Sequence, residues 1–230
     1  MMKDFQIQLV GVSKVYHANG LPVRALDGIA LTVNAGEFAV LAGPSGSGKS
    51  TILHLIGALD RPTEGKVFIE GDDLYARSRE GLAAFRLNKI GFVFQAYNLI
   101  PVLTARENVE YPLLLQRIEK KERLRRSEEL LLHVGLKAQM SKRPGEMSGG
   151  QQQRVAVARA LATKPQVVLA DEPTANLDSH TGSALIDLFR ELNDQYKVTF
   201  LFASHDAMVI SRAHRVIHLK DGRVEGEEIQ

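Results

Sequence analysis

The chain has 230 residues, of which 44% are apolar and 24% charged, and its formal net charge is +2; this length suits one substantial domain or a core domain with an inserted lobe. The small charge is spread along the chain and predicts no nucleic-acid partner, while the lack of cysteine excludes disulfides, thiolate metal sites and cysteine nucleophiles. No stretch approaches the roughly 20 apolar residues of a spanning helix, and the N-terminal segment, with an acid at Asp4, does not resemble a secretion signal.

The first part of the chain has the pattern of strands. Up to Asn34 apolar residues alternate with period two, which predicts strands joined by short turns. Residues 37–43 are a short apolar run that stops at Gly43, as a buried strand would. From Lys49 the period becomes helical, and further strands are expected at residues 66–71 and before Gln95, with a helix at 81–89 between them.

The segment 96–145 differs in character. Thr104 and Glu107 have the capping-box spacing of a helix start. Residues 119–136 are a charged amphipathic stretch, with Leu124, Leu131 and Val134 on the side that would face other parts of the protein. We therefore predict that residues 96–145 form an inserted helical subdomain between two parts of one core domain, 1–95 and 146–230.

Strand and helix alternate again after this insertion. Strands are expected at residues 166–172, 198–205 and 215–224, with a helix at 179–196 and a short helix after residue 205. Strands with intervening helices predict an α/β fold whose sheet is mainly parallel and covered by helices on its faces.

A glycine-rich loop, GPSGSGKS at residues 43–50, lies between an apolar strand and an amphipathic helix. It fits the phosphate-loop pattern G-x-x-x-x-G-K-[ST], and this context disfavours the alternative of a glycine turn with an incidental lysine. Glycines let backbone N–H groups turn towards phosphate oxygens, and the helix N-terminus adds a partial positive charge. Lys49 would bridge the β- and γ-phosphates, and the Ser50 hydroxyl would bind Mg²⁺, a hard ion that prefers oxygen. The phosphate-binding candidates are Gly43, Pro44, Ser45, Gly46, Ser47, Gly48, Lys49, Ser50 and Thr51.

Two adjacent carboxylates, Asp171 and Glu172, follow an apolar run in VVLADEP at residues 167–173. Strand ends of this kind deliver side chains to the ligand crevice of an open α/β sheet. Asp171 suits a magnesium shell, and Glu172 could reach the water behind the γ-phosphate. Because neighbouring carboxylates repel each other, a bound dication would explain the pair better than a solvated strand end does.

A second glycine turn, MSGGQ at residues 147–151, also opens a helix and could receive an anion. On its own it indicates no more than a helix N-cap. In combination with the phosphate loop, Gln95, VVLADEP, ANLD and ASH in this order, it makes the chain closely resemble the ATP-binding cassette family, from about Tyr16 to the C-terminus. The resemblance implies a P-loop NTPase core that carries an antiparallel β subdomain and the inserted helical subdomain, and it implies ATP hydrolysis with Mg²⁺. Met147 replaces the usual leucine of this motif, a mild apolar exchange.

In that family two cassettes pair head to tail, and the SGGQ signature of each caps the ATP held by the other. The resemblance therefore implies a homodimer or a pair with a sister cassette. It assigns Ser148, Gly149, Gly150 and Gln151 to the γ-phosphate of the partner's ATP.

The other site residues follow from the same resemblance. Tyr16 would stack on adenine, with a buried strand aromatic as the alternative. Gln95 would reach the magnesium and the attacking water and link the core to the helical subdomain. Glu172 would be the base, His205 would contact the γ-phosphate, and Asp178 would lie at the dimer seam. The implied catalytic residues are Lys49, Gln95, Glu172 and His205, and the implied metal ligands are Ser50, Gln95 and Asp171.

Residues 94–113, FQAYNLIPVLTARENVEYPL, resemble the subgroup that serves lipoprotein release and macrolide-type efflux. This implies a subunit held on the cytoplasmic face of the cell (inner) membrane by separate permease subunits, for lipoprotein release, macrolide or peptide efflux or envelope remodelling. Leu99, Ile100 and Pro101 are candidates for the permease contact, and packing within the helical subdomain is an equal alternative. The rival class is a non-transport ATPase. A DNA-repair head would be split by a long coiled coil, and a ribosome-associated factor would carry two cassettes.

Overall fold

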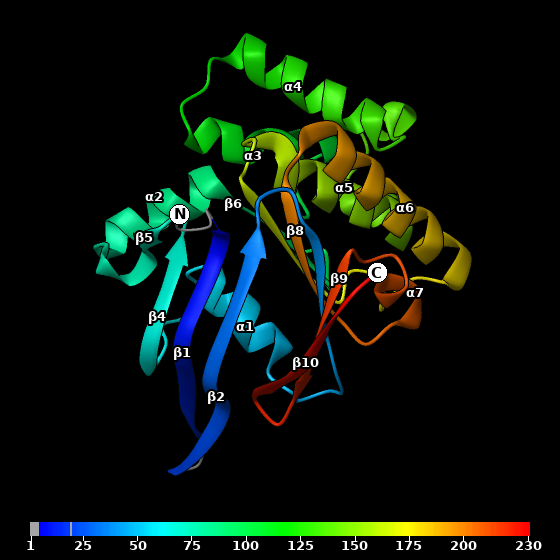
Figure 1. The fold of residues 1–230 in the computed structure, drawn as a ribbon. Coiled ribbons are helices and arrows are strands. Elements are labelled where there is room, and N and C mark those ends of the chain that lie inside the picture. The colour runs from blue at the N-terminus through cyan, green and yellow to red at the C-terminus, as the bar shows by residue number, and fades with distance from the viewer. Residues whose placement is uncertain (1–4, 19) are drawn as a thin grey trace.

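The computed structural model describes residues 5–18 and 20–230, which form two sheets with helices packed around them (Figure 1). Asp4, which contributes to the exclusion of a secretion signal, lies outside the described residues. The strands are β1 (Phe5–Ala18), β2 (Leu21–Asn34), β3 (Phe38–Ala42), β4 (Glu64–Ile69), β5 (Asp72–Asp73), β6 (Ile90–Phe94), β7 (Val167–Asp171), β8 (Thr199–Ser204), β9 (Arg215–Lys220) and β10 (Arg223–Ile229).

Seven α-helices connect these strands in the described part of the chain. They are α1 (Lys49–Ile56), α2 (Arg79–Lys89), α3 (Ala105–Leu115), α4 (Lys120–His133), α5 (Gly149–Ala162), α6 (Ser179–Tyr196) and α7 (Ala207–Ile210). Short 3-10 turns lie at Leu74–Ala76, Lys137–Gln139 and Pro144–Glu146. Among the described residues, no helix is both long and apolar enough to cross a membrane.

The larger sheet has the order β10-β9-β3-β8-β7-β6. Its strands pair in parallel except for β9 and β10, which form an antiparallel hairpin. The smaller sheet, β2-β1-β4-β5, is antiparallel throughout. Together with the helices this confirms the predicted fold class. Because β3, β8, β7 and β6 are parallel neighbours, the residues that follow each of them meet at one edge of the sheet.

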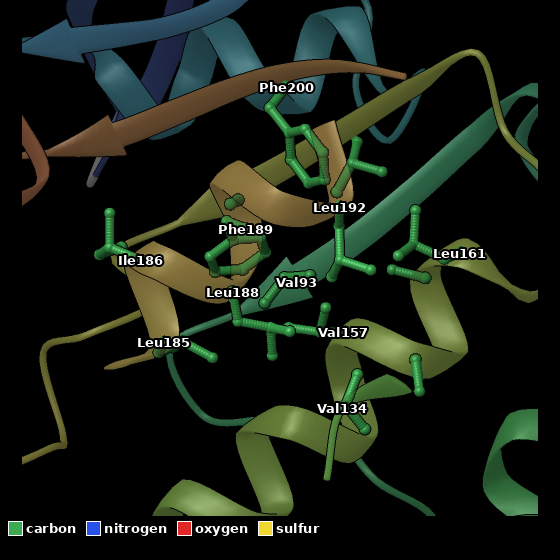
Figure 2. Close-up of a cluster of buried hydrophobic side chains, with 14 of the residues drawn as sticks. Val93, Val134, Val157, Leu161, Leu185, Ile186, Leu188, Phe189, Leu192 and Phe200 are labelled. Carbon is green, nitrogen blue, oxygen red and sulfur yellow. The ribbon is translucent and has the colours of Figure 1, made fainter. Parts of the chain in front are cut away.

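Alternate residues of the central strands enter two separate cores. Phe38 and Val40 of β3 belong to a cluster shared with helices α3 to α6, whereas Leu41 faces a cluster shared with α1 and the antiparallel sheet. This is the period of two expected of a strand buried on both faces. Figure 2 shows the first cluster, where Phe189 and Leu192 of α6 meet Phe200 of β8. The two cores hold the strand ends in fixed positions relative to α1 and α5.

Helices α3 and α4 lie together at one end of the molecule, away from the antiparallel sheet (Figure 1). The predicted capping box is present, because Thr104 Oγ1 accepts from the Glu107 amide at 3.2 Å and the Glu107 carboxylate accepts from the Thr104 amide at 2.8 Å. Leu131 and Val134 are fully buried in the first core, and Leu124 is half-buried. The subdomain limits at 96 and 145 stay a prediction.

Candidate nucleotide-binding site

The phosphate-loop candidate connects the end of β3 to the start of α1. Gly43, Gly46 and Gly48 have φ angles of 154°, 80° and 102°, which residues with a side chain rarely adopt. Space is limited as well, since a Cβ on Gly48 would lie 2.6 Å from Leu26 Cδ2 and 2.9 Å from the Ala25 carbonyl oxygen. The backbone turn therefore favours glycine at all three positions, and the packing of β2 requires it at Gly48 as well.

Lys49 lies at the start of α1 with only 6% of its surface exposed. Its Nζ donates to the carbonyl oxygens of Gly43 at 2.7 Å and Pro44 at 3.0 Å, and lies 4.0 Å from Glu172 Oε1. These carbonyls belong to the loop itself, so the ammonium is held over the concave side of the turn, where a phosphate would be bound.

Ser50 and Asp171 meet across the sheet edge. The Ser50 hydroxyl donates to Asp171 Oδ1 at 2.9 Å, which joins the start of α1 to the end of β7. Burial raises the pKa of the Asp171 carboxyl, and the hydrogen bond from Ser50 opposes that rise. A hydroxyl and a carboxylate oxygen at this distance are hard donors that could share one small cation, so the pair fits Mg²⁺.

Glu172 has an unusual backbone for a residue with a side chain, with φ at 44°. Its amide donates to the Ala203 carbonyl at 2.9 Å, which ties it to the neighbouring strand β8. Its carboxylate lies 2.8 Å from His205 Nδ1 and accepts a hydrogen bond from the Ser204 hydroxyl at 3.3 Å. The backbone turn and both contacts from the end of β8 aim this carboxylate into the site.

A cavity of about 480 Å³ opens in front of these groups. Its lining includes Gln95, Thr51 and His205 from three different segments, and it also includes Ala25 and Ala175, which the sequence did not point to. The complete lining is Ala25, Ser45, Gly46, Gly48, Lys49, Ser50, Thr51, Gln95, Glu172, Ala175 and His205. The fold therefore brings most of the predicted phosphate-binding and catalytic residues to one opening.

Tyr16 lies beside this opening rather than in its lining. Its hydroxyl donates to Asp60 Oδ2 at 2.9 Å, and Lys14 Nζ lies 4.8 Å from the ring centroid. Partial burial of the hydroxyl and its bond to Asp60 raise the pKa of Tyr16. Since 37% of the residue is exposed, Tyr16 is not a buried strand aromatic, and its stacking on adenine stays a prediction.

The signature residues do not line the cavity of their own chain. Ser148 caps α5, and its backbone and side chain exchange hydrogen bonds with Gln151 at 3.0 and 3.3 Å. Asp178 caps α6 through one hydrogen bond, which its carboxylate accepts from the Thr181 amide at 2.9 Å, and this bond lowers the pKa of Asp178. Ser148 and Asp178, which cap these two helices, are both exposed.

Three polar side chains that the sequence did not single out brace the site. Gln153 Nε2 of α5 donates to the Pro173 carbonyl at 2.8 Å. Arg159 donates to the Tyr97 carbonyl at 2.9 Å, and Asn108 accepts from the Ile100 amide at 2.8 Å. No local pattern distinguishes these residues from the surface polar residues of a helix, so only burial in the fold reveals them.

A second opening, of about 450 Å³, lies between α2, β6 and α3. Its apolar lining includes Leu59, Phe92 and Leu115. Asn98 lines it, but Leu99, Ile100 and Pro101 do not, and Leu99 packs against the first core instead.

A phosphate loop ahead of a helix, a strand-end carboxylate bonded to the loop serine and a second acid beside a strand-end histidine define a P-loop nucleotide hydrolase. Residues 26–175 match the family model of the ABC transporter, which is more than half of the chain. The chain therefore belongs to the ABC transporter family, as one of its ATP-hydrolysing subunits.

Individual relatives agree with this placement. The lipoprotein-releasing system ATP-binding protein LolD of Anaeromyxobacter dehalogenans is 48% identical, over 95% of this chain and 92% of its own length. The macrolide export ATP-binding/permease protein MacB of Wolinella succinogenes is 46% identical over 95% of this chain, which spans only 34% of MacB. The ATP-binding cassette MJ0796 of Methanocaldococcus jannaschii, solved as a dimer in a post-hydrolysis state with ADP and Pi, matches with a TM-score of 0.90, 44% identity and coverage of 97% of this chain and 98% of its own.

Proposed function

We propose that this chain works as a head-to-tail homodimer that closes on two ATP molecules, opens after hydrolysis, and thereby drives a membrane permease. One observation carries this proposal: the cavity is lined by phosphate-loop residues, Glu172 and His205 but by none of the signature residues 148–151. A second copy would supply the missing signature. The dimeric form of the related cassette MJ0796 supports the arrangement.

Within one such site the groups have separate tasks. The loop N–H groups and Lys49 hold the phosphates, and Lys49 exchanges its bonds to the loop carbonyls for bonds to phosphate oxygens. Glu172 orients the attacking water and accepts its proton, while His205 holds the Glu172 carboxylate and reaches the γ-phosphate. Mg²⁺, held through Ser50 and Asp171 with Gln95 beside them, would neutralise the charge that develops on the phosphate oxygens.

The proposed permease contact is the apolar opening between α2, β6 and α3. Leu59, Tyr111 and Leu115 present 48%, 42% and 52% of their surfaces there, and no described element of the chain covers them. A short cytoplasmic helix of a permease would bury these residues, directly beside the Leu99–Pro101 segment. The likeness to LolD and MacB supports a permease for lipoprotein release or macrolide-type export, and a place on the cytoplasmic face of the inner membrane.

Exchange of Glu172 for glutamine tests this function. Glu172→Gln keeps the hydrogen-bonding shape of the carboxylate but cannot accept a proton, so turnover should fall about 100-fold or more. ATP binding should persist, and light scattering should show an ATP-dependent dimer that accumulates. Glu191→Gln, an exposed position on α6, is the matched control and should behave as the wild type. Turnover of Glu172→Gln at the wild-type rate, or a variant that stays monomeric with ATP, would contradict the proposal.

A further inference from the structure

The two signature glycines are not explained by their backbone. Gly149 and Gly150 form the first turn of α5, and neither lies in the left-handed region of φ. Alanine would be more favourable there, because glycine loses more backbone freedom than alanine when it enters a helix. A requirement for glycine at these positions must therefore come from what surrounds them.

Both glycines are closely approached by side chains of their own chain. A Cβ on Gly149 would lie 2.7 Å from the Tyr97 hydroxyl oxygen, and one on Gly150 would lie 2.5 Å from Thr181 Cγ2. By contrast, a Cβ on Gly145, a few residues earlier, would have no neighbouring atom within 4 Å. The start of α5 is thus wedged between the segment that follows Gln95 and the start of α6.

The Tyr97 side of this wedge is held firmly. Tyr97 and Asn98 have φ angles of 61° and 49°, and their carbonyl oxygens accept hydrogen bonds from Arg159 at 2.9 and 2.5 Å. Arg159 belongs to α5, the helix that begins at Gly149, and burial lowers the pKa of its guanidinium. Gln95, two residues before Tyr97, is also held, because its carbonyl accepts a hydrogen bond from the Asn176 side chain at 3.0 Å. The segment 95–98 is therefore hydrogen-bonded both to the loop that follows β7 and to α5.

We infer that Tyr97 is a positioning residue that sets the signature of its own chain according to the state of the Gln95 segment. Gln95 lines the cavity of its own chain, whereas the signature serves the ATP of the partner under the proposed head-to-tail dimer, on which this inference rests. A displacement of the Gln95 segment moves the Tyr97 hydroxyl, and the tight contact with Gly149 passes that displacement to the signature. One side chain in this way links the two ATP sites of the dimer.

A pair of substitutions, one that adds a methyl group at Gly149 and one that removes the Tyr97 hydroxyl, tests the contact between these two residues. Gly149→Ala keeps the signature N–H but collides with the Tyr97 hydroxyl, so ATP turnover should fall about tenfold or more. Adding Tyr97→Phe removes that hydroxyl and leaves only contacts of 3.7 Å to the new methyl group, from the ring and from Leu177. The double variant should recover most of the activity. If Gly149→Ala stays equally impaired with Phe at position 97, the glycine is required by the partner's nucleotide and the inference is wrong.

A complementation assay shows on which site Tyr97 acts. One protomer carries Ser148→Arg, which blocks its signature, and the other carries Lys49→Ala, which disables its phosphate loop. Each homodimer should be inactive, and the mixture should regain one live site. Adding Tyr97→Ala to the Lys49→Ala protomer, which contributes only a signature to that site, should lower the regained rate about tenfold. Tyr196→Ala in the same protomer, an exposed tyrosine on α6, is the control and should leave it unchanged.

The outcomes separate the two proposals. If the mixture of Ser148→Arg and Lys49→Ala protomers regains no activity, the head-to-tail function fails before Tyr97 is tested. If it regains activity and Tyr97→Ala in the signature protomer has no effect, the function stands and the positioning by Tyr97 is refuted.

Discussion

Asn108 offers a quantitative test of how the bend at residues 100–104 is held. It lies on α3 with no exposed surface, and its side chain accepts from the Ile100 amide at 2.8 Å. Its own amide donates to the carbonyls of Ile100, Leu103 and Thr104 at 3.0 to 3.1 Å. One helix side chain thus bonds four backbone polar groups of the bend at residues 100–104.

The cost of Asn108→Ala can be estimated from these bonds. The Asn108 amide has two protons and one acceptor oxygen, so its four contacts count as three hydrogen bonds, each worth about 1 kcal/mol net. Alanine returns about 0.5 kcal/mol through its better helix propensity. The free energy of unfolding should therefore fall by about 2.5 kcal/mol.

Urea unfolding followed by circular dichroism measures this difference. Asn88→Ala is the control, since Asn88 is an exposed helical asparagine whose amide makes two surface hydrogen bonds. It donates to the Ala84 carbonyl at 2.7 Å and accepts from Gln116 Nε2 at 2.9 Å. This substitution should change the free energy by less than about 0.5 kcal/mol. A loss below about 1 kcal/mol for Asn108→Ala would refute the reasoning, because the bend would then be held by other contacts.

Two further predictions concern the apolar opening between α2, β6 and α3 and the pair formed by Ser50 and Asp171. Leu115→Asp should abolish stimulation of the ATPase by permease in proteoliposomes and keep the basal rate. Leu114→Asp is the control, because Leu114 is 50% exposed but lies outside the opening, and it should keep both the basal rate and the stimulation. Loss of stimulation in both variants would argue against the opening as the permease contact. Asp171 has a raised pKa in the folded protein, so the folded state binds its proton more tightly and loses stability as the pH rises from about 4 through that raised pKa. Asp171→Asn should therefore stabilise the nucleotide-free protein to urea at pH 7 and lose this advantage near about pH 3.5, and an equal gain at both pH values would show that the carboxyl is not destabilising when charged.

Features that depend on neighbours in sequence were predictable. The phosphate loop, the capping box at Thr104 and the strand ending at Asp171 each need only a short pattern, because glycine turns, helix caps and buried strands are formed by consecutive residues. The order of these motifs then led to the family and the fold.

Features that depend on distant residues were not predictable. Arg159 and Tyr97 are 62 positions apart, and nothing near either residue indicates that they meet. Leu99 shows the same limit, since an apolar residue in a loop can face a partner or the core, and in the structure it packs on the core. The close approach of Tyr97 to Gly149 also depends on the relative placement of β6 and α5, which the spacing of motifs does not specify.

The cavity holds the phosphate loop and the catalytic residues but no signature, so under the proposed head-to-tail dimer hydrolysis depends on the meeting of two copies. Two free copies must collide before ATP is consumed, so the ATPase rate of free subunits should rise with the square of their concentration when dimers are scarce. A permease with two docking positions would keep two copies at an effective concentration of about a millimolar. Subunits in dilute solution would then spend little ATP, and hydrolysis would be concentrated where there is a membrane protein to move.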